Sequence, residues 1–228
     1  MPVNALLSSL PLAEGSTHAH TGAWVAAVLR SRIAEGQLLP GAKLSEQALS
    51  AAMGVSRNTL REAFAVLDHE LVITRIPNRG VFVSSPGPEG VREIYAVRRM
   101  IEPAAVLWGP DLDVAALAAI IVDARAALED GNIAKMADAN QCFHEELVRA
   151  TGSVHLQELM TKVLAQMRLV FHAMGDAPDF HSHYVELNAA LVELLQSGKR
   201  EQAAEEMRGY LDRAEAELLS HLGDSEGN

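Results

Sequence analysis

The segment "SRNTLR" carries side chains that suit the base edges and phosphates of duplex nucleic acid. Arg57 and Arg61 are four residues apart, with Asn58 and Thr59 between them. Arginine can contact guanine O6 and N7 together, and asparagine can contact adenine N6 and N7 in the same way. The hydroxyl groups of Ser56 and Thr59, and the free N–H groups of a helix start, suit phosphate oxygens. The alternative is an ordinary solvated helix face, because these residue types are common at helix starts.

The neighbouring pattern indicates the helices that would position this turn. Residues 22–35 have amphipathic spacing, and Ser45 can cap a helix with the body "EQALSAAM". A short break at 54–55 precedes a third helix, 57–69, which Ser56 can cap. The residues of this third helix expected to face inward are Leu60, Phe64 and Leu67.

After the third helix the period changes to that of β-strands. "VITRI" and "VFVSS" are short and β-branched, and the four residues 77–80 between them predict a hairpin turn. Arg79 and Gly80 at its tip would reach a neighbouring groove or the DNA backbone. Three helices and a hairpin indicate a winged helix-turn-helix DNA-binding domain over 21–84.

The remainder of the chain reads as helices. "SPGPEG", 85–90, is the clearest linker, and an all-helical domain is expected over 91–222. A flexible leader is expected at 1–20 and a tail at 223–228. The expected fold class is therefore mostly α, with an N-terminal winged helix-turn-helix and a C-terminal antiparallel helical bundle. The expected helices are 90–107, 112–130, 133–150, 154–174, 180–197 and 199–221.

Charge is distributed unevenly over the 228 residues. The net charge is −11. Residues 1–84 carry seven Lys/Arg and six Asp/Glu, whereas residues 85–228 carry 12 and 24. DNA contacts are therefore expected from the first part, since the second would repel phosphate. The single cysteine fits a reducing compartment, and no apolar run is long enough for a membrane span, so a cytoplasmic protein is expected.

The first part resembles the N-terminal domain of GntR-type bacterial transcription regulators. "LLPGAKLSEQALSAAMGVSRNTLREAFAVLDHE" and "PNRGVFV" match that pattern over about 60 residues. The resemblance implies base and phosphate contacts at Arg57, Thr59, Arg61 and Gly80. The DNA-binding set expected from pattern and resemblance together is Ser45, Gln47, Ser56, Arg57, Asn58, Thr59, Arg61, Arg79 and Gly80.

Three departures from the family pattern stand out. Gln47 replaces a frequent arginine, which weakens one phosphate contact. Asn58 and Thr59 stand where the family often has Thr-Pro, which should alter the preferred operator. Leu71 replaces the glycine that usually follows the recognition helix, so a different helix ending is expected.

The second part resembles the ligand-binding FCD domain of the FadR-like branch, which implies that 91–222 is an effector-binding and dimerisation domain. The matching segments are "REIYAVRRMIEP", "NQCFHEELVRATGS" and "AALVELLQSGKREQAAEEMRGYL". Many members hold a divalent metal with one Asp and three His, and these positions fall on Asn140, His144, Asn188 and Tyr210. Only His144 is a strong ligand, so no metal or other cofactor is expected, and the four should form a neutral hydrogen-bonded cluster. A site rebuilt from histidines 172, 181 or 183 is left open, although these are expected to be surface or loop residues.

Such a cluster is a candidate effector pocket. A small anionic metabolite could dock on Arg98 or Arg168, with His172 on the same helix face as Arg168. The alternative is that Arg98 and Glu102 form only an i,i+4 ion pair. The expected effector-binding set is Arg98, Asn140, His144, Arg168, His172, Asn188 and Tyr210.

These observations favour a DNA-binding transcription regulator, a repressor more than an activator, that works as a homodimer on a palindromic operator and responds to an effector. One alternative is a dimeric adaptor whose winged helix binds protein. The other is a small helical enzyme using His144 with Glu145 and Glu146, or Cys142. The sequence lacks any hydrolase motif or phosphate-binding loop, so no enzyme is expected.

Overall fold

The computed structural model describes residues 21–173 and 178–226. Residue contacts divide them into two units. The first contains the described residues up to Pro86 together with Ala165–Ala173, and the second contains the rest. The expected leader, 1–20, lies outside the described residues.

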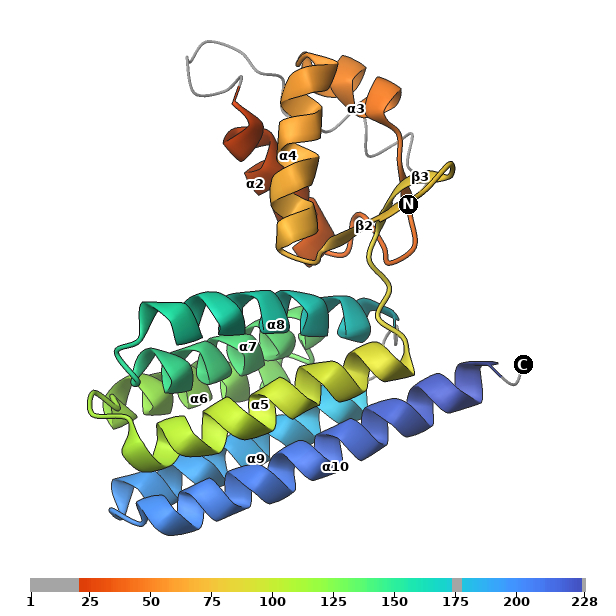
Figure 1. Ribbon diagram of the computed structural model, residues 1–228. Coiled ribbons are helices and arrows are strands. Elements are labelled where there is room, and N and C mark those ends of the chain that lie inside the picture. Colours follow the sequence, from red (N-terminus) through yellow and green to blue (C-terminus); the bar gives the residue numbers. More distant parts are fainter. Residues whose placement is uncertain (1–20, 174–177, 227–228) are drawn as a thin grey trace. The chain divides into compact units, whose positions relative to one another are not determined.

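The first unit is a winged helix-turn-helix (Figure 1). The three strands form an antiparallel sheet in the order β1-β3-β2. The pair β2–β3 is the expected hairpin, whereas β1 was not predicted, because two residues are too few to show a period. The elements are α2 (Gly22–Ala34), β1 (Lys43–Leu44), α3 (Glu46–Met53), α4 (Arg57–His69), β2 (Ile73–Ile76) and β3 (Gly80–Val83).

Capping interactions fix the turn between α3 and α4. Ser45 Oγ accepts the N–H of Ala48 over 3.3 Å at the start of α3, and Gly54 ends that helix at φ 66°. Ser56 Oγ then accepts the N–H of Thr59 over 3.1 Å and begins α4. The residues expected to face inward from α4 are fully buried, as predicted: Leu60, Phe64 and Leu67.

Two local expectations in this unit were wrong. Gly80 belongs to β3 and pairs with Ile76, so the hairpin loop contains three residues and not four. The end of α4 keeps the left-handed conformation despite the missing glycine, because Leu71 itself adopts φ 62°. The N–H of Val72 bonds the carbonyl of Leu67 over 3.1 Å, which closes the helix with a Schellman-type bond.

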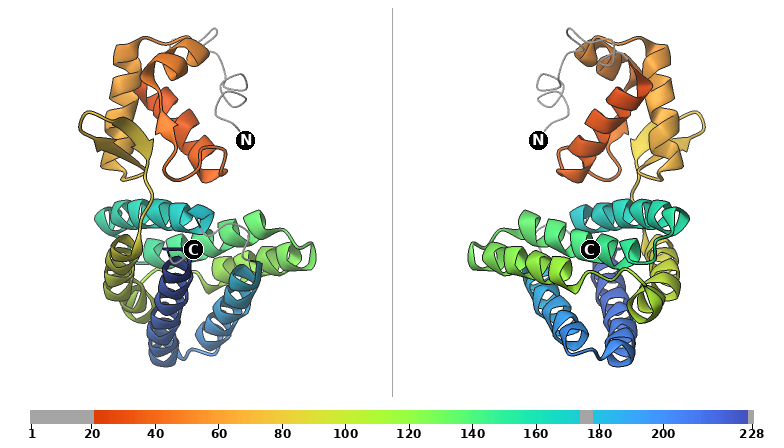
Figure 2. Two further views of the ribbon diagram at one scale, coloured as in Figure 1. Left: turned by 90° about the vertical axis from the view of Figure 1, so that its right-hand side faces the viewer. Right: turned by 90° about the vertical axis from the view of Figure 1, so that its left-hand side faces the viewer.

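The second unit is an antiparallel helical bundle (Figures 1 and 2). α5 packs chiefly against α10, and α6 packs against α7 and α9. Of the helices described, none combines the length and apolarity that a membrane crossing needs. The helices are α5 (Pro88–Trp108), α6 (Val114–Glu129), α7 (Ile133–Arg149), α8 (Val154–Ala173), α9 (Pro178–Gln196) and α10 (Arg200–Glu226). Of α8, only the residues up to Leu164 belong to this unit.

Two expected boundaries in this unit differ from the structure. The expected linker, 85–90, is shorter, because α5 begins at Pro88, where a proline fits the first helical turn. The expected tail from 223 is mostly helical, since α10 continues to Glu226.

Candidate functional site

The first turn of α4 presents a cation that is available for a partner. Arg57 is exposed at the start of α4, and its guanidinium forms no ion pair or hydrogen bond within residues 21–173 and 178–226. The buried Leu60 anchors the same turn, so Arg57 projects from a fixed helix start. A helix N-terminus with an unpaired arginine suits the phosphates and bases of DNA.

The other polar residues of this turn are engaged within the domain. Arg61 Nε lies 3.1 Å from Glu46 Oε2 on α3, and Asn58 Nδ2 donates to Glu62 Oε1 over 2.8 Å. Ser56 and Thr59 hydroxyls lie 2.9 Å apart. The Arg61 side chain is 61% exposed, so its ion pair is weak and can open. The helical period places Asn58 and Glu62 on the same face, which explains their pairing.

The wing carries the expected Arg79 and a second cation, Lys43, that the sequence did not reveal. The guanidinium of Arg79 lies 5.9 Å from the Phe82 ring centroid, and Lys43 Nζ of β1 lies 5.8 Å from the same centroid. Lys43 meets Phe82 because β1 pairs with β3. A Cβ on Gly80, whose φ is 114°, would lie 3.3 Å from Lys43 Cε, so glycine leaves room for this side chain. Ser45 and Gln47 are exposed at the start of α3.

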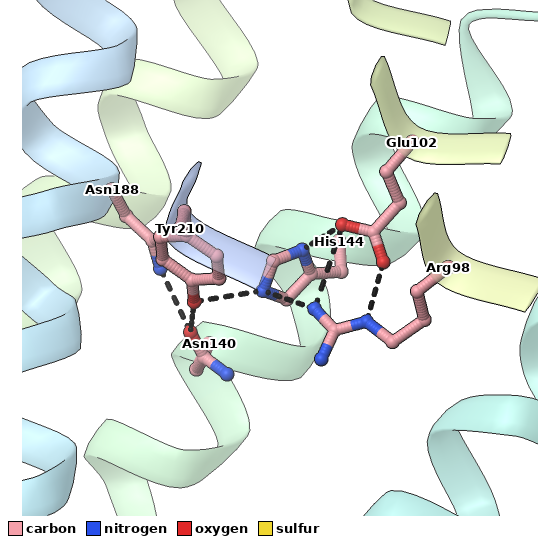
Figure 3. Close-up of polar contacts among 6 residues, drawn as sticks. All are labelled: Arg98, Glu102, Asn140, His144, Asn188 and Tyr210. Atoms are coloured by element: carbon pink, nitrogen blue, oxygen red, sulfur yellow. Dashed lines mark hydrogen bonds and ion pairs between the residues drawn. The ribbon is translucent and has the colours of Figure 1, made fainter. Parts of the chain in front are cut away.

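A polar cluster lies inside the second unit (Figure 3). Arg98 Nε donates to Glu102 Oε1 over 2.6 Å, and Arg98 Nη2 lies 3.0 Å from His144 Nε2. The opposite ring nitrogen, His144 Nδ1, lies 2.7 Å from Glu102 Oε2. All three side chains are almost completely buried. The arginine–glutamate pair of α5 therefore contacts both ring nitrogens of one histidine on α7.

The charges of this triad follow from burial and from one another. Burial acts to raise the pKa of Glu102, but Arg98 and His144 outweigh it and hold the value at about 2. Burial lowers the pKa of His144, although Glu102 opposes this. We therefore assign a neutral imidazole with its proton on Nδ1, facing Glu102, and Nε2 as the acceptor for Arg98. Arg98 and Glu102 together leave no net charge.

Amide and phenol groups continue the cluster towards α9 and α10. Tyr210 OH lies 3.1 Å from His144 Nε2 and 3.2 Å from Asn140 Oδ1. Asn188 Nδ2 donates to the same Asn140 oxygen over 2.8 Å. Asn188 Oδ1 is buried and accepts no hydrogen bond from any residue that the structure describes. One hydrogen-bond acceptor of the cluster is thus unused.

The structure brings together five of the expected effector-binding residues and adds one. Asn140, His144, Asn188 and Tyr210 form the expected cluster, but it is not built from neutral groups alone, because it contains the Arg98–Glu102 ion pair. The two residues of that pair are one helical turn apart, and only the tertiary structure shows that they are buried. Its energetic role is therefore not that of a solvated i,i+4 pair.

The remaining expected residues lie elsewhere. Arg168 and His172 fall in the segment of α8 that groups with the first unit, so the structure does not bring them into the cluster. His181 is 7% exposed within α9, and His183 is exposed on the same helix, so the expectation of surface or loop positions was wrong for His181. Cys142 is exposed and not enclosed among apolar residues.

The donor set of the cluster does not fit the divalent metal of the FCD resemblance. Both ring nitrogens of its single imidazole already face other groups, Nε2 Arg98 and Nδ1 Glu102, and the Arg98 guanidinium beside Nε2 would repel a divalent cation. Amide oxygens from Asn140 and Asn188 are weak ligands for zinc or nickel. Within the described residues, no three His, Cys, Asp or Glu side chains gather in a way that could hold a metal ion.

Comparison with family-wide sequence patterns assigns both units. Residues 21–83 match the bacterial regulatory proteins of the gntR family, and residues 93–213 match the FCD domain. Among solved structures, a putative transcriptional regulator GntR from Rhodococcus sp. RHA1 has a TM-score of 0.82 at 36% identity, covering 87% of this chain and 97% of that one. E. coli McbR/YncC has a TM-score of 0.74 at 21% identity, with the same coverage, and shares the fold.

Curated relatives match over a shorter length. The gluconate operon transcriptional repressor of Bacillus subtilis (strain 168) is 32% identical over 146 residues, 61% of this chain and 58% of the relative. An uncharacterized HTH-type transcriptional regulator in an unstable DNA locus of Streptomyces ambofaciens is 32% identical over 126 residues, 54% of this chain and 53% of the relative. The chain thus spans little more than half the length of these two relatives.

Proposed function

This chain belongs to the bacterial regulatory proteins of the gntR family that carry an FCD domain, and we propose that it is a sequence-specific DNA-binding transcription regulator, acting as a repressor. Its place of action is then the cytoplasm, and it is a regulator without catalytic activity. The observation that carries this proposal is Arg57, exposed and unpaired on the first turn of α4.

DNA binding would combine two surfaces of the first unit. The start of α4 offers Arg57 and, once released from Glu46, Arg61. The wing offers Arg79 and Lys43, which both lie close to the Phe82 ring. None of these cations is buried, so each can exchange water for phosphate or base contacts at small cost.

A homodimer on a two-fold symmetric operator is part of the proposal. One winged module contacts only a few base pairs, so two modules are needed for useful specificity. The operator selected by the protein should then contain two inverted half-sites, and sedimentation velocity should give twice the monomer mass.

The proposed regulation is by a small, anionic metabolite bound in the second unit. The gluconate operon repressors among the relatives support gluconate as the first compound to test, because it is a small carboxylate. The proposed site is free of metal, since the Arg98 guanidinium already lies beside His144 Nε2, where a metal would have to bind. The residues that would respond are those joined to it: Glu102, His144, Tyr210, Asn140 and Asn188.

The experiment is selection of duplex DNA from a random library, followed by binding measurements on the selected site. Arg57→Met should weaken binding at least tenfold, in keeping with about 1–3 kcal/mol for a good base contact. Arg208→Met, an exposed arginine on α10, is the matched control and should leave binding unchanged. Enrichment of no sequence, with no gel shift at low salt, would favour the protein-binding adaptor instead.

A further inference from the structure

A hollow of about 470 Å³ lies between α9 and α10, next to the polar cluster. Its volume is in the range of small-molecule sites. α9 lines it with apolar side chains of one helix face, Leu187, Leu191 and Leu194. Tyr210 lines the hollow from α10, and its hydroxyl is bonded to His144 and Asn140 in the cluster. One side chain therefore belongs to both the hollow and the cluster.

Arg98 is unsuited as the anchor of an anionic ligand. Its side chain is 2% exposed, and its guanidinium is already bonded to Glu102 and His144. An incoming carboxylate would have to displace Glu102, which remains ionised because its pKa is held at about 2. The anchor must therefore be sought among cations that are unpaired.

The hollow offers such a cation beside Tyr210. Arg213 lies three residues after Tyr210, on the same face of α10, and lines the hollow. It is exposed and makes no ion pair with any described residue, and the same holds for Lys199 at the turn before α10. The hollow thus has cationic groups that no internal carboxylate neutralises by direct contact.

Two carboxylates of the hollow restrict the kind of anion it can hold. Glu206, four residues before Tyr210 on α10, and Glu193 on α9 line the same space. They would repel a compact anion such as phosphate, yet carboxylate oxygens accept hydrogen bonds from hydroxyl groups. A ligand with a negative group at one end and hydroxyl groups along its length satisfies both sets of charges, and its carbon chain can lie on the leucines.

We infer that the hollow between α9 and α10 binds a small carboxylate that carries several hydroxyl groups, a sugar acid by class. Its carboxylate pairs with Arg213, and its hydroxyl groups donate to Glu206 and Glu193. This inference rests on the proposed function, for which it supplies the effector class and the site. It moves the anion anchor from α5 to α10.

The position of Tyr210 gives such a ligand a route to the rest of the cluster. A ligand packed against Tyr210 would shift the hydroxyl that bonds His144, and His144 bonds the Arg98–Glu102 pair of α5. α5 begins at Pro88, only five residues after β3 ends at Val83. Tyr210 is thus a positioning residue between ligand and helix α5.

The test is calorimetric titration of the full chain with three probes: gluconate, sorbitol and hexanoate. Sorbitol keeps the hydroxyl groups without the carboxylate, and hexanoate keeps the carboxylate without hydroxyl groups. Both should bind at least tenfold more weakly than gluconate. Hexanoate binding as tightly as gluconate, or no gluconate binding at 10 mM (about four decades above a typical micromolar Kd), would overturn the inference.

Two variants locate the site. Arg213→Met should weaken gluconate binding at least tenfold and leave sorbitol unchanged, whereas Arg208→Met should alter neither. Glu206→Gln should narrow the difference in affinity between gluconate and hexanoate. The change removes a carboxylate that accepts hydrogen bonds from the hydroxyl groups of gluconate and that repels both anions. Gluconate affinity unchanged by Arg213→Met would refute the site.

DNA binding without ligand, measured on the same samples, separates this inference from the proposed function. Retained operator binding with no gluconate response refutes the inference alone. Gluconate binding without any DNA binding supports the hollow and refutes the proposed function.

Discussion

Arg98 Nε donates to Glu102 Oε1 over 2.6 Å inside the helical unit, one helical turn away, and neither side chain is more than 2% exposed. Both groups lose their hydration on folding. For each of them, contacts with the other group and with His144 compensate for this loss. The pair therefore fixes α5 to α7 by interactions that cannot be removed singly without leaving a buried charge.

Glu102→Gln should destabilise the protein by about 3–5 kcal/mol, because it leaves the Arg98 charge buried and uncompensated. The matched control is Glu205→Gln, which breaks an exposed pair with Arg208 and should cost less than about 1 kcal/mol. Urea unfolding measures both. A loss below about 1 kcal/mol for Glu102→Gln would contradict the burial of the pair.

Acidification should weaken the fold through the same triad. The pKa of Glu102 is about 2 in the folded protein, below its ordinary value of 4.5, so the folded state binds fewer protons there than the unfolded state. The lowered pKa of His144 acts in the same direction from its ordinary 6.5 downward. The Glu102 contribution is present above pH 4.5 and is lost as the pH falls towards 2.

The free energy of unfolding measured at pH 7, 5 and 3 tests this dependence. Glu102→Gln should show a smaller decrease between pH 5 and 3 than the unmodified protein, because the variant lacks the carboxyl group. An equal decrease in both proteins would assign the acid sensitivity to other groups.

Leu71→Gly should stabilise the first unit by about 1 kcal/mol, since leucine is strained at φ 62° and glycine is not. The matched control is Leu39→Gly. Leu39 is equally exposed at 50% but is not among the residues with positive φ, so glycine there should destabilise. Thermal unfolding measures both changes, and a destabilising Leu71→Gly would refute the strain.

Glu46→Gln should strengthen DNA binding several-fold at low salt. The change frees Arg61 from its ion pair and removes a negative charge beside α4. The slope of log K against log salt should steepen by about 0.9 if Arg61 gains one phosphate. Glu70→Gln, which breaks the Arg30–Glu70 pair at the far end of α4, should leave both quantities unchanged.

Nickel, zinc and EDTA should each leave the Tm and gluconate binding unchanged, because Arg98 occupies the electrostatic position that a metal would need. Differential scanning fluorimetry with and without each additive measures this. A Tm increase of several degrees with nickel or zinc would show that the cluster rearranges to bind the ion.

The sequence by itself determined the local structure and the order of elements. The cap at Ser56, the break at Gly54 and the apolar spacing of α4 act over a few residues, so they can be read directly. The same holds for the helical period of the second unit. The set Asn140, His144, Asn188 and Tyr210 came instead from a family resemblance, because its members are far apart in the sequence.

The tertiary structure decided which polar side chains are free to bind a partner and which are paired within the protein. Glu46 is 15 residues from Arg61, and Lys43 is 39 residues from Phe82, so neither contact follows from a local period. Burial likewise depends on helix packing, and it converts Arg98–Glu102 from a surface pair into the ionic part of a closed cluster. The sequence identified the chemical groups, while packing determined which ones neutralise each other and which remain free to bind.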